Sequence, residues 1–103
     1  MNASIERVKV EILLDAPLVD LVADIVEKAG AGGYTLVRAL GGSGHNGRWS
    51  EDRVSAADTK LILLAIATDR IAEAIVRQLE PLLSSHGLIV MTTRIGVVRG
   101  EKF

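Results

Sequence analysis

Apolar and polar residues alternate strictly between Arg7 and Leu14. Successive side chains of a strand point to opposite faces, so this period of two predicts a half-buried β-strand. The face turned toward the core is expected to hold Val8, Val10, Ile12 and Leu14.

Two later stretches carry apolar residues at helical spacing, which predicts two amphipathic helices. The first is expected to have Asp15 as its N-cap and Pro17 in its first turn. The second is expected to open at Thr68 or Asp69 and to be kinked or ended by Pro81. The apolar stripes comprise Leu18, Leu21, Val22, Ile25, Val26 and Ala29 in the first helix and Ile71, Ile75, Leu79, Leu82 and Leu83 in the second.

Three further apolar runs predict strands over residues 34–40, 60–67 and 88–99, the last with a bulge or bend at Gly96. The order of elements is then β-α-β-β-α-β. Two such split βαβ units predict an α+β, ferredoxin-like fold, in which both helices cover one face of a four-stranded antiparallel sheet. The length of 103 residues fits a single domain, spanning residues 1–103.

The other face of that sheet is also predicted to be apolar. The run KLILLAIA at 60–67 places apolar residues on both faces, and so does the last strand. Apolar faces of this extent usually mark an interface. We therefore expect an oligomer, joined sheet to sheet or edge to edge.

Composition removes several classes of function. The net charge of −1 argues against a nucleic-acid partner, and the absence of cysteine removes disulfides and thiolate zinc sites. His45 and His86 do not stand at metal-ligand spacing, so no metal site is expected. No apolar segment approaches the length of a membrane span or a signal peptide, so a soluble, cytoplasmic protein is expected.

The least regular part of the chain lies between the second and third predicted strands, over residues 41–59. Its sequence, GGSGHNGRWSEDRVSAADT, has 19 residues, whereas hairpins turn in two to five and structureless loops of this length are usually functional or disordered. Its glycines would let backbone N–H groups surround an anion, with further donors on Ser43, His45, Asn46 and Arg48. A flexible hairpin tip remains the alternative.

Two arginines on the last strand are candidate phosphate ligands. Arg94 and Arg99 fall on opposite faces of a regular strand, but a bulge at Gly96 would bring them to the same face. The alternative is a solvated strand end. Ser43 and His45 do not make a catalytic pair without a third group to orient them, so no enzyme is expected.

These features together resemble the PII family of signalling proteins, and more closely its PII-like branch associated with carboxysomes and bicarbonate. The segment GYTLVRALGGSGHNG, residues 33–47, is similar to the stretch that leads into the family's long T-loop. The segment RIGVVRGE, residues 94–101, is similar to its arginine-rich last strand. Residues 41–59 would accordingly be the T-loop.

The resemblance implies a homotrimer that requires no cofactor and binds an adenine nucleotide in the clefts between subunits. Thr35 and Ala67 would lie near the adenine, and Arg99, together with Arg94, would reach the phosphates. The phosphates or a second anion would be wrapped by Gly41, Gly42, Ser43, Gly44 and His45. The family's phosphate-binding B-loop has no counterpart in SSHGLIVM, residues 84–91, which favours ADP or AMP as ligand, with cyclic AMP or ATP as further possibilities.

The same resemblance implies bicarbonate as a co-ligand and a protein target read by the loop. Bicarbonate would bind at Gly44, His45, Asn46 and Arg48, while Arg48, Trp49 and Arg53 would contact the target, a bicarbonate transporter or a carboxysome-related protein. Two alternatives stay open. One is a small ferredoxin-like hydrolase using Ser43, His45 or Arg48, and the other is a nitrogen-type PII regulator that binds ATP.

Overall fold

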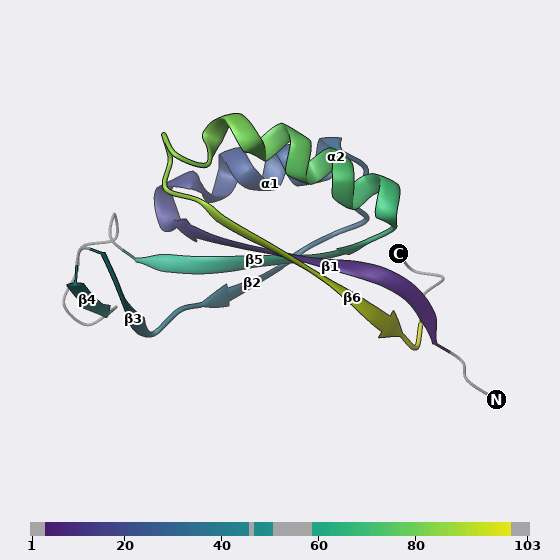
Figure 1. The fold of residues 1–103 in the computed structure, drawn as a ribbon, viewed down its shortest axis with the longest axis horizontal. Helices are drawn as coiled ribbons and strands as arrows, with labels where there is room; N and C mark the ends of the chain where they lie inside the picture. Colours follow the sequence, from purple (N-terminus) through teal and green to yellow (C-terminus); the bar gives the residue numbers. More distant parts are fainter. Residues whose placement is uncertain (1–3, 46, 51–58, 100–103) are drawn as a thin grey trace.

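The computed structural model describes residues 4–45, 47–50 and 59–99, apart from the side chains of Trp49 and Ser50. Figure 1 shows a sheet with two helices lying over one of its faces and a small ribbon that extends from one end. In chain order the elements are the strand β1 (Ile5–Asp15), a 3₁₀ turn (Ala16–Leu18), α1 (Val19–Lys28), β2 (Thr35–Arg38), β3 (Gly41–Gly44), β4 (Gly47–Ser50), β5 (Lys60–Ala67), α2 (Asp69–Leu79), a second 3₁₀ turn (Glu80–Leu82) and β6 (Ile89–Val97).

The main sheet has the strand order β2-β5-β1-β6, and each neighbouring pair is antiparallel. The two central strands, β1 and β5, are therefore joined by hydrogen bonds on both sides, while β2 and β6 form the edges. The two helices pack on one face of this sheet (Figure 1). The predicted α+β, ferredoxin-like arrangement is confirmed.

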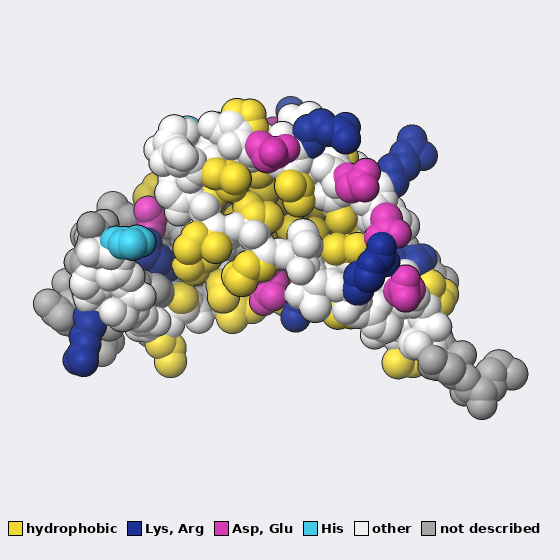
Figure 2. Space-filling view, in the orientation of Figure 1, with side chains coloured by type: hydrophobic (Ala, Val, Ile, Leu, Met, Phe, Trp, Pro, Cys, Tyr) yellow, Lys and Arg dark blue, Asp and Glu magenta, His cyan; other side chains and the backbone are white. Residues whose placement is uncertain are grey.

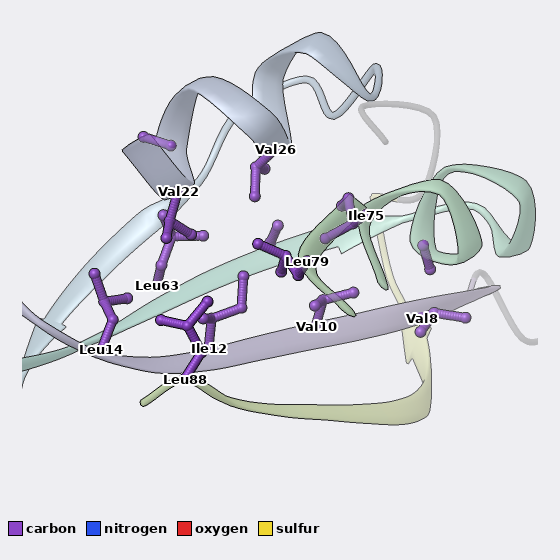
Figure 3. Close-up of a cluster of buried hydrophobic side chains, with 13 residues drawn as sticks. Val8, Val10, Ile12, Leu14, Val22, Val26, Leu63, Ile75, Leu79 and Leu88 are labelled. Atoms are coloured by element: carbon purple, nitrogen blue, oxygen red, sulfur yellow. The ribbon is translucent and has the colours of Figure 1, made fainter. Parts of the chain in front are cut away.

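The core lies between the sheet and the helices. The alternation that starts at Arg7 is confirmed, because every second residue of β1 from Val8 to Leu14 is buried. Side chains from β1 and β5 meet those of the two helices in one cluster (Figure 3). The largest fully buried members are Ile12, Leu14, Leu63, Ile75, Leu79, Val10, Val22 and Val26.

The start of the first helix differs from the prediction. Pro17 lies in the 3₁₀ turn, and the α-helix begins only at Val19. Asp15 makes no side-chain capping hydrogen bond there; its carboxylate instead pairs with Lys60 across the sheet. Leu21, expected in the apolar stripe, is 42% exposed.

The second helix follows the prediction more closely. Thr68 is its N-cap, and the Thr68 hydroxyl accepts a hydrogen bond of 3.3 Å from the backbone N–H of Ile71. The helix ends at Leu79, and Pro81 lies in the 3₁₀ turn that follows. Gly87, at a φ of +62°, then reverses the chain into β6.

The sheet face away from the helices is apolar at its flanks, as predicted. Directly paired residues of antiparallel strands share a face, so the register assigns Ile62, Leu64 and Ile66 of β5 to this side. Their exposure is intermediate, and Ile89 and Met91 of β6 are exposed beside the central strand. This second apolar face is the open face of the sheet.

The predicted bulge at Gly96 is wrong. β6 pairs with β1 in an unbroken register from Ile89 to Val97, so Gly96 stands opposite Glu6 in a regular ladder. A side chain at position 96 would place its Cβ 3.2 Å from the Ser4 hydroxyl oxygen. This contact is tighter than usual, so a glycine packs more easily there.

Candidate functional site

The glycine-rich segment forms a two-stranded ribbon over residues 41–50, where the sequence predicted a loop without regular structure. Gly41 pairs with Ser50, Gly42 with Trp49, Ser43 with Arg48 and Gly44 with Gly47. His45 lies in the tight turn between the two strands. Gly47 has a φ of +97°, a backbone conformation that residues with a side chain rarely adopt.

Pairing limits how this ribbon can hold an anion. In an antiparallel pair the N–H groups of alternate residues point toward the partner strand, so only every second amide of residues 41–44 is directed outward. Gly44, His45 and Arg48 are exposed. Asn46, Arg53 and the side chain of Trp49, also assigned to the loop by the sequence, lie outside the described part of the chain.

The base of the ribbon is fixed at the ends of three strands. The backbone N–H of Ala39 donates to the carbonyl of Lys60 at 3.1 Å, and that of Ala16 donates to the carbonyl of Thr59 at 2.7 Å. The Lys60 ammonium contacts the Asp15 carboxylate at 2.6 Å, with both side chains partly buried. The residues that flank the segment 41–59 are therefore held next to each other.

The other candidate residues lie toward the opposite end of the sheet. Ala67 ends β5, Arg94 stands near the end of β6, and Arg99 lies in the turn that follows β6. β5 begins at the ribbon and rises about 3.3 Å per residue, so its two ends are about 23 Å apart. The ribbon and the end of β6 accordingly lie at opposite ends of the sheet in Figure 1.

This separation means that one chain does not bring its own candidate residues together. Thr35 and Ala67 are also divided, because Thr35 pairs with Leu64 on the open face whereas Ala67 pairs with Val8 beneath the helices. Ala67 is 2% exposed as a whole residue, so in the isolated chain it offers a ligand almost no surface. A site that includes both the ribbon and Arg99 needs a second copy of the chain.

Arg94, predicted as a phosphate ligand, is paired with two carboxylates of this chain. The register places it on the helix side of β6, opposite Val8. Its guanidinium contacts the Glu6 carboxylate at 3.1 Å and the Asp69 carboxylate at 3.2 Å, joining β1, β6 and the start of α2. No sequence pattern pointed to Glu6 and Asp69 as partners of Arg94. Which residues of different elements lie side by side becomes apparent only in the folded structure.

Arg94 also separates two hollows on this side of the molecule. The larger has a volume of about 530 Å³ and runs between α2 and β6; the smaller, of about 410 Å³, lies by Ser4 and Glu6. Figure 2 shows acidic and basic side chains gathered at this end, beside an apolar patch. The larger hollow is lined by Val8, Asp69, Ala72, Glu73, Val76, Arg77, Glu80, Thr92, Thr93 and Arg94.

Two kinds of feature are missing from residues 4–45, 47–50 and 59–99. Within these ranges no three histidine or acidic side chains come together in a way that could hold a metal ion. In the same ranges no helix is both long and apolar enough to cross a membrane.

Residues 7–102 match the model of the family "Nitrogen regulatory protein P-II". The chain belongs to the P-II family. No curated protein matches it.

The solved structures give the same fold. CPII, a nitrogen regulatory PII-like protein from Thiomonas intermedia K12, aligns over 100% of this chain and 98% of its own, with a TM-score of 0.90 and 24% identity. A second structure of CPII gives a TM-score of 0.87 over 100% and 99% of the two chains, again at 24% identity. A protein from Thermus thermophilus described as a PII-like signalling protein aligns over 97% of each chain, with a TM-score of 0.84 and 25% identity.

Proposed function

We propose that this protein is a non-enzymatic, cytoplasmic signal-transduction protein that binds ADP or AMP together with bicarbonate. Binding takes place in the clefts between the subunits of a homotrimer. It changes the conformation of the T-loop, residues 41–59, which then engages or releases a protein of inorganic-carbon uptake or fixation.

The observation that carries this proposal is the division of the candidate residues between the two ends of the sheet. The ribbon lies at one end, and Arg99 lies beyond the other. A head-to-tail arrangement joins the ribbon end of one copy to the far end of the next, and three such contacts close a ring. The apolar flanks of the open face support the same assembly, because they would be buried between copies.

The ligand class follows from the family and from the short connection after the second helix. Only residues 83–88 join the second 3₁₀ turn to β6, which leaves no room for a separate phosphate-binding loop. Fewer donors favour a nucleotide with fewer phosphates. Structures of CPII hold ADP, AMP and bicarbonate, which supports the same ligands for this chain.

The residues divide into roles across the cleft. In one subunit Thr35 lies near the adenine on the open face, Ala67 borders the same pocket from the end of β5, and Arg99 binds the phosphates. The next subunit supplies its ribbon, where outward amides of 41–44 and the side chains of His45 and Arg48 hold the phosphate end and bicarbonate. Arg48, Trp49 and Arg53 are the part of the loop that the target contacts.

Calorimetry with ADP, AMP, ATP and cyclic AMP, each with and without bicarbonate, tests the ligand. We expect heat with ADP and AMP, and tighter binding when bicarbonate is present. Tight ATP binding that bicarbonate leaves unchanged would favour a nitrogen-type regulator, and no heat with any nucleotide would refute the proposal. Sedimentation of the same samples tests the trimer.

The variant Arg99→Gln tests the phosphate contact. Loss of a charge-assisted hydrogen bond to a phosphate is expected to weaken ADP binding by about ten- to a hundredfold. The matched control is Arg70→Gln, which removes the same charge from an exposed position on α2 that lines neither hollow and should leave ADP affinity within about twofold. Equal effects of the two variants would show that Arg99 acts only through overall charge.

A further inference from the structure

Arg94 is held by two carboxylates at the edge of the cleft. We propose that it does not bind the nucleotide but neutralises Glu6 and Asp69, and so lets the phosphates approach Arg99. This inference rests on the proposed function, because it assumes a nucleotide at this end of the sheet. It assigns Arg94 a positioning role in place of the ligand role suggested by the sequence.

The geometry commits both ends of the Arg94 guanidinium. One terminal nitrogen, Nη1, contacts Glu6 Oε1 at 3.1 Å, and the other, Nη2, contacts Asp69 Oδ1 at 3.2 Å. A guanidinium has five N–H groups, so Arg94 keeps further donors, but a phosphate would have to compete for its charge with the two carboxylates that it already pairs. Arg99 meets no such competition, since it makes no hydrogen bond or ion pair with any part of the chain that the structure describes.

The charges around the larger hollow explain why neutralisation is needed. Asp69, Glu73 and Glu80 line it from α2, and Glu6 borders the adjoining smaller hollow. Among the described residues that line the two hollows, only Arg77 and Arg94 oppose these four carboxylates. Loss of Arg94 would increase the excess of negative charge around the two hollows, so a phosphate approaching this end of the sheet would be repelled more strongly.

The position of the two carboxylates makes the effect specific to the cleft. Asp69 follows Ala67 by two residues, and Glu6 stands opposite Gly96, three residues before Arg99. Side-chain exposures of 62% for Arg94, 76% for Glu6 and 63% for Asp69 indicate that none of the three supports the core. Substitutions among them should therefore leave the fold intact, because surface ion pairs contribute little to stability.

The test compares ADP affinity among Arg94→Gln, the double variant Glu6→Gln/Asp69→Asn, and the triple variant that combines all three substitutions. We expect Arg94→Gln to bind ADP about three- to tenfold more weakly than wild type. This difference in affinity should shrink as salt is added, because salt screens the repulsion between the carboxylates and the phosphates. In the triple variant the uncompensated carboxylates are gone, so affinity should return to within about twofold of wild type.

Arg77→Gln is the matched control, because it removes a positive charge from the same hollow without leaving carboxylates that it had paired. Its ADP affinity should change less than that of Arg94→Gln. Thermal unfolding of every variant checks that all of them are folded at the temperature of the titration.

Two results would overturn the inference. If the triple variant binds as weakly as Arg94→Gln, the guanidinium itself contacts the nucleotide; if Arg94→Gln binds like wild type, the neutralisation has no role. Either result leaves the proposed function standing, as long as the wild-type protein binds ADP. Failure of the wild type to bind ADP would instead refute the proposed function.

Discussion

The main sheet and the glycine ribbon are both antiparallel, yet they are specified in different ways. In the sheet, alternate side chains of β1 and β5 enter the core, so shifting a strand by one residue would expose the buried set. In the ribbon, β3 consists of three glycines and Ser43, and no member of it is buried. The ribbon's register rests on backbone hydrogen bonds and on the turn at His45.

The difference teaches where the molecule can change shape at small cost. Rearranging the sheet would uncover core side chains, whereas rearranging the ribbon breaks backbone bonds that water can replace. An isolated two-stranded ribbon is at best marginally stable in water. A segment that must change conformation when a ligand binds is therefore well placed in the ribbon.

The largest expected effect comes from two neighbouring leucines of β5. Leu63 is fully buried beneath the helices, whereas Leu64 lies on the open face. Leu63→Ala should lower the free energy of unfolding by about 3 kcal/mol, because it leaves a cavity in the core. Leu64→Ala should leave the stability of the isolated chain within about 1 kcal/mol of wild type and weaken self-association instead.

Urea unfolding and sedimentation of the two variants make this measurement. If both substitutions destabilise the chain equally at concentrations where it is monomeric, the open face is part of the folding core. The distinction between a buried face that stabilises the chain and an open face that mediates self-association would then be wrong.

A smaller effect is expected at the junction between sheet and ribbon. Asp15→Asn removes the ion pair with Lys60 and should cost about 1 kcal/mol of global stability, as expected for a partly exposed pair. It should also speed proteolytic cleavage within 41–59, since Lys60, where this segment returns to the sheet, loses its ion pair with residue 15. Limited proteolysis of both proteins, with Asp24→Asn on the exposed surface of α1 as control, tests whether the pair fixes the base.

The smallest effect on global stability is expected within the ribbon itself. Gly47→Ala introduces a side chain at a φ of +97°, which should destabilise the ribbon by about 1 kcal/mol or more. The urea midpoint should hardly move, because no described side chain of the ribbon lies in the core, while amide exchange at Trp49 should accelerate. Gly44→Ala is the control, since its cross-strand position has an ordinary φ and open space around it. A large fall in the urea midpoint for Gly47→Ala would show that ribbon and sheet unfold together.

The sequence predicted the sheet well because its strands are encoded by side-chain alternation. β5 occupies the predicted residues 60–67, and Thr68 caps the second helix as one of two expected residues. The ribbon could not be predicted in the same way, since glycines carry no apolar alternation and the ladder needs only backbone groups. Its length suggested a structureless loop, whereas its first half is paired.

Arg94 and Arg99 show a second limit of prediction from the sequence. The odd spacing of Arg94 and Arg99 was visible, but the proposed bulge at Gly96 was wrong, because β6 pairs with β1 there without a break. The carboxylates that hold Arg94 come from residues 6 and 69, far from it in the sequence. The separation of Ala67 from the ribbon likewise becomes apparent only when the strands are laid side by side.

The closeness of the two ends of the segment 41–59 has a consequence for protein engineering. Ala39 and Lys60 are joined by a backbone hydrogen bond of 3.1 Å, so the chain leaves the sheet and returns to it at almost the same point. Any peptide whose ends can meet fits between them, and lengthening it adds little closure entropy. Residues 41–59 could therefore be exchanged as a unit. Loops from related proteins could be grafted between the same two strands without redesign of the core, and foreign recognition sequences could be displayed in the same place.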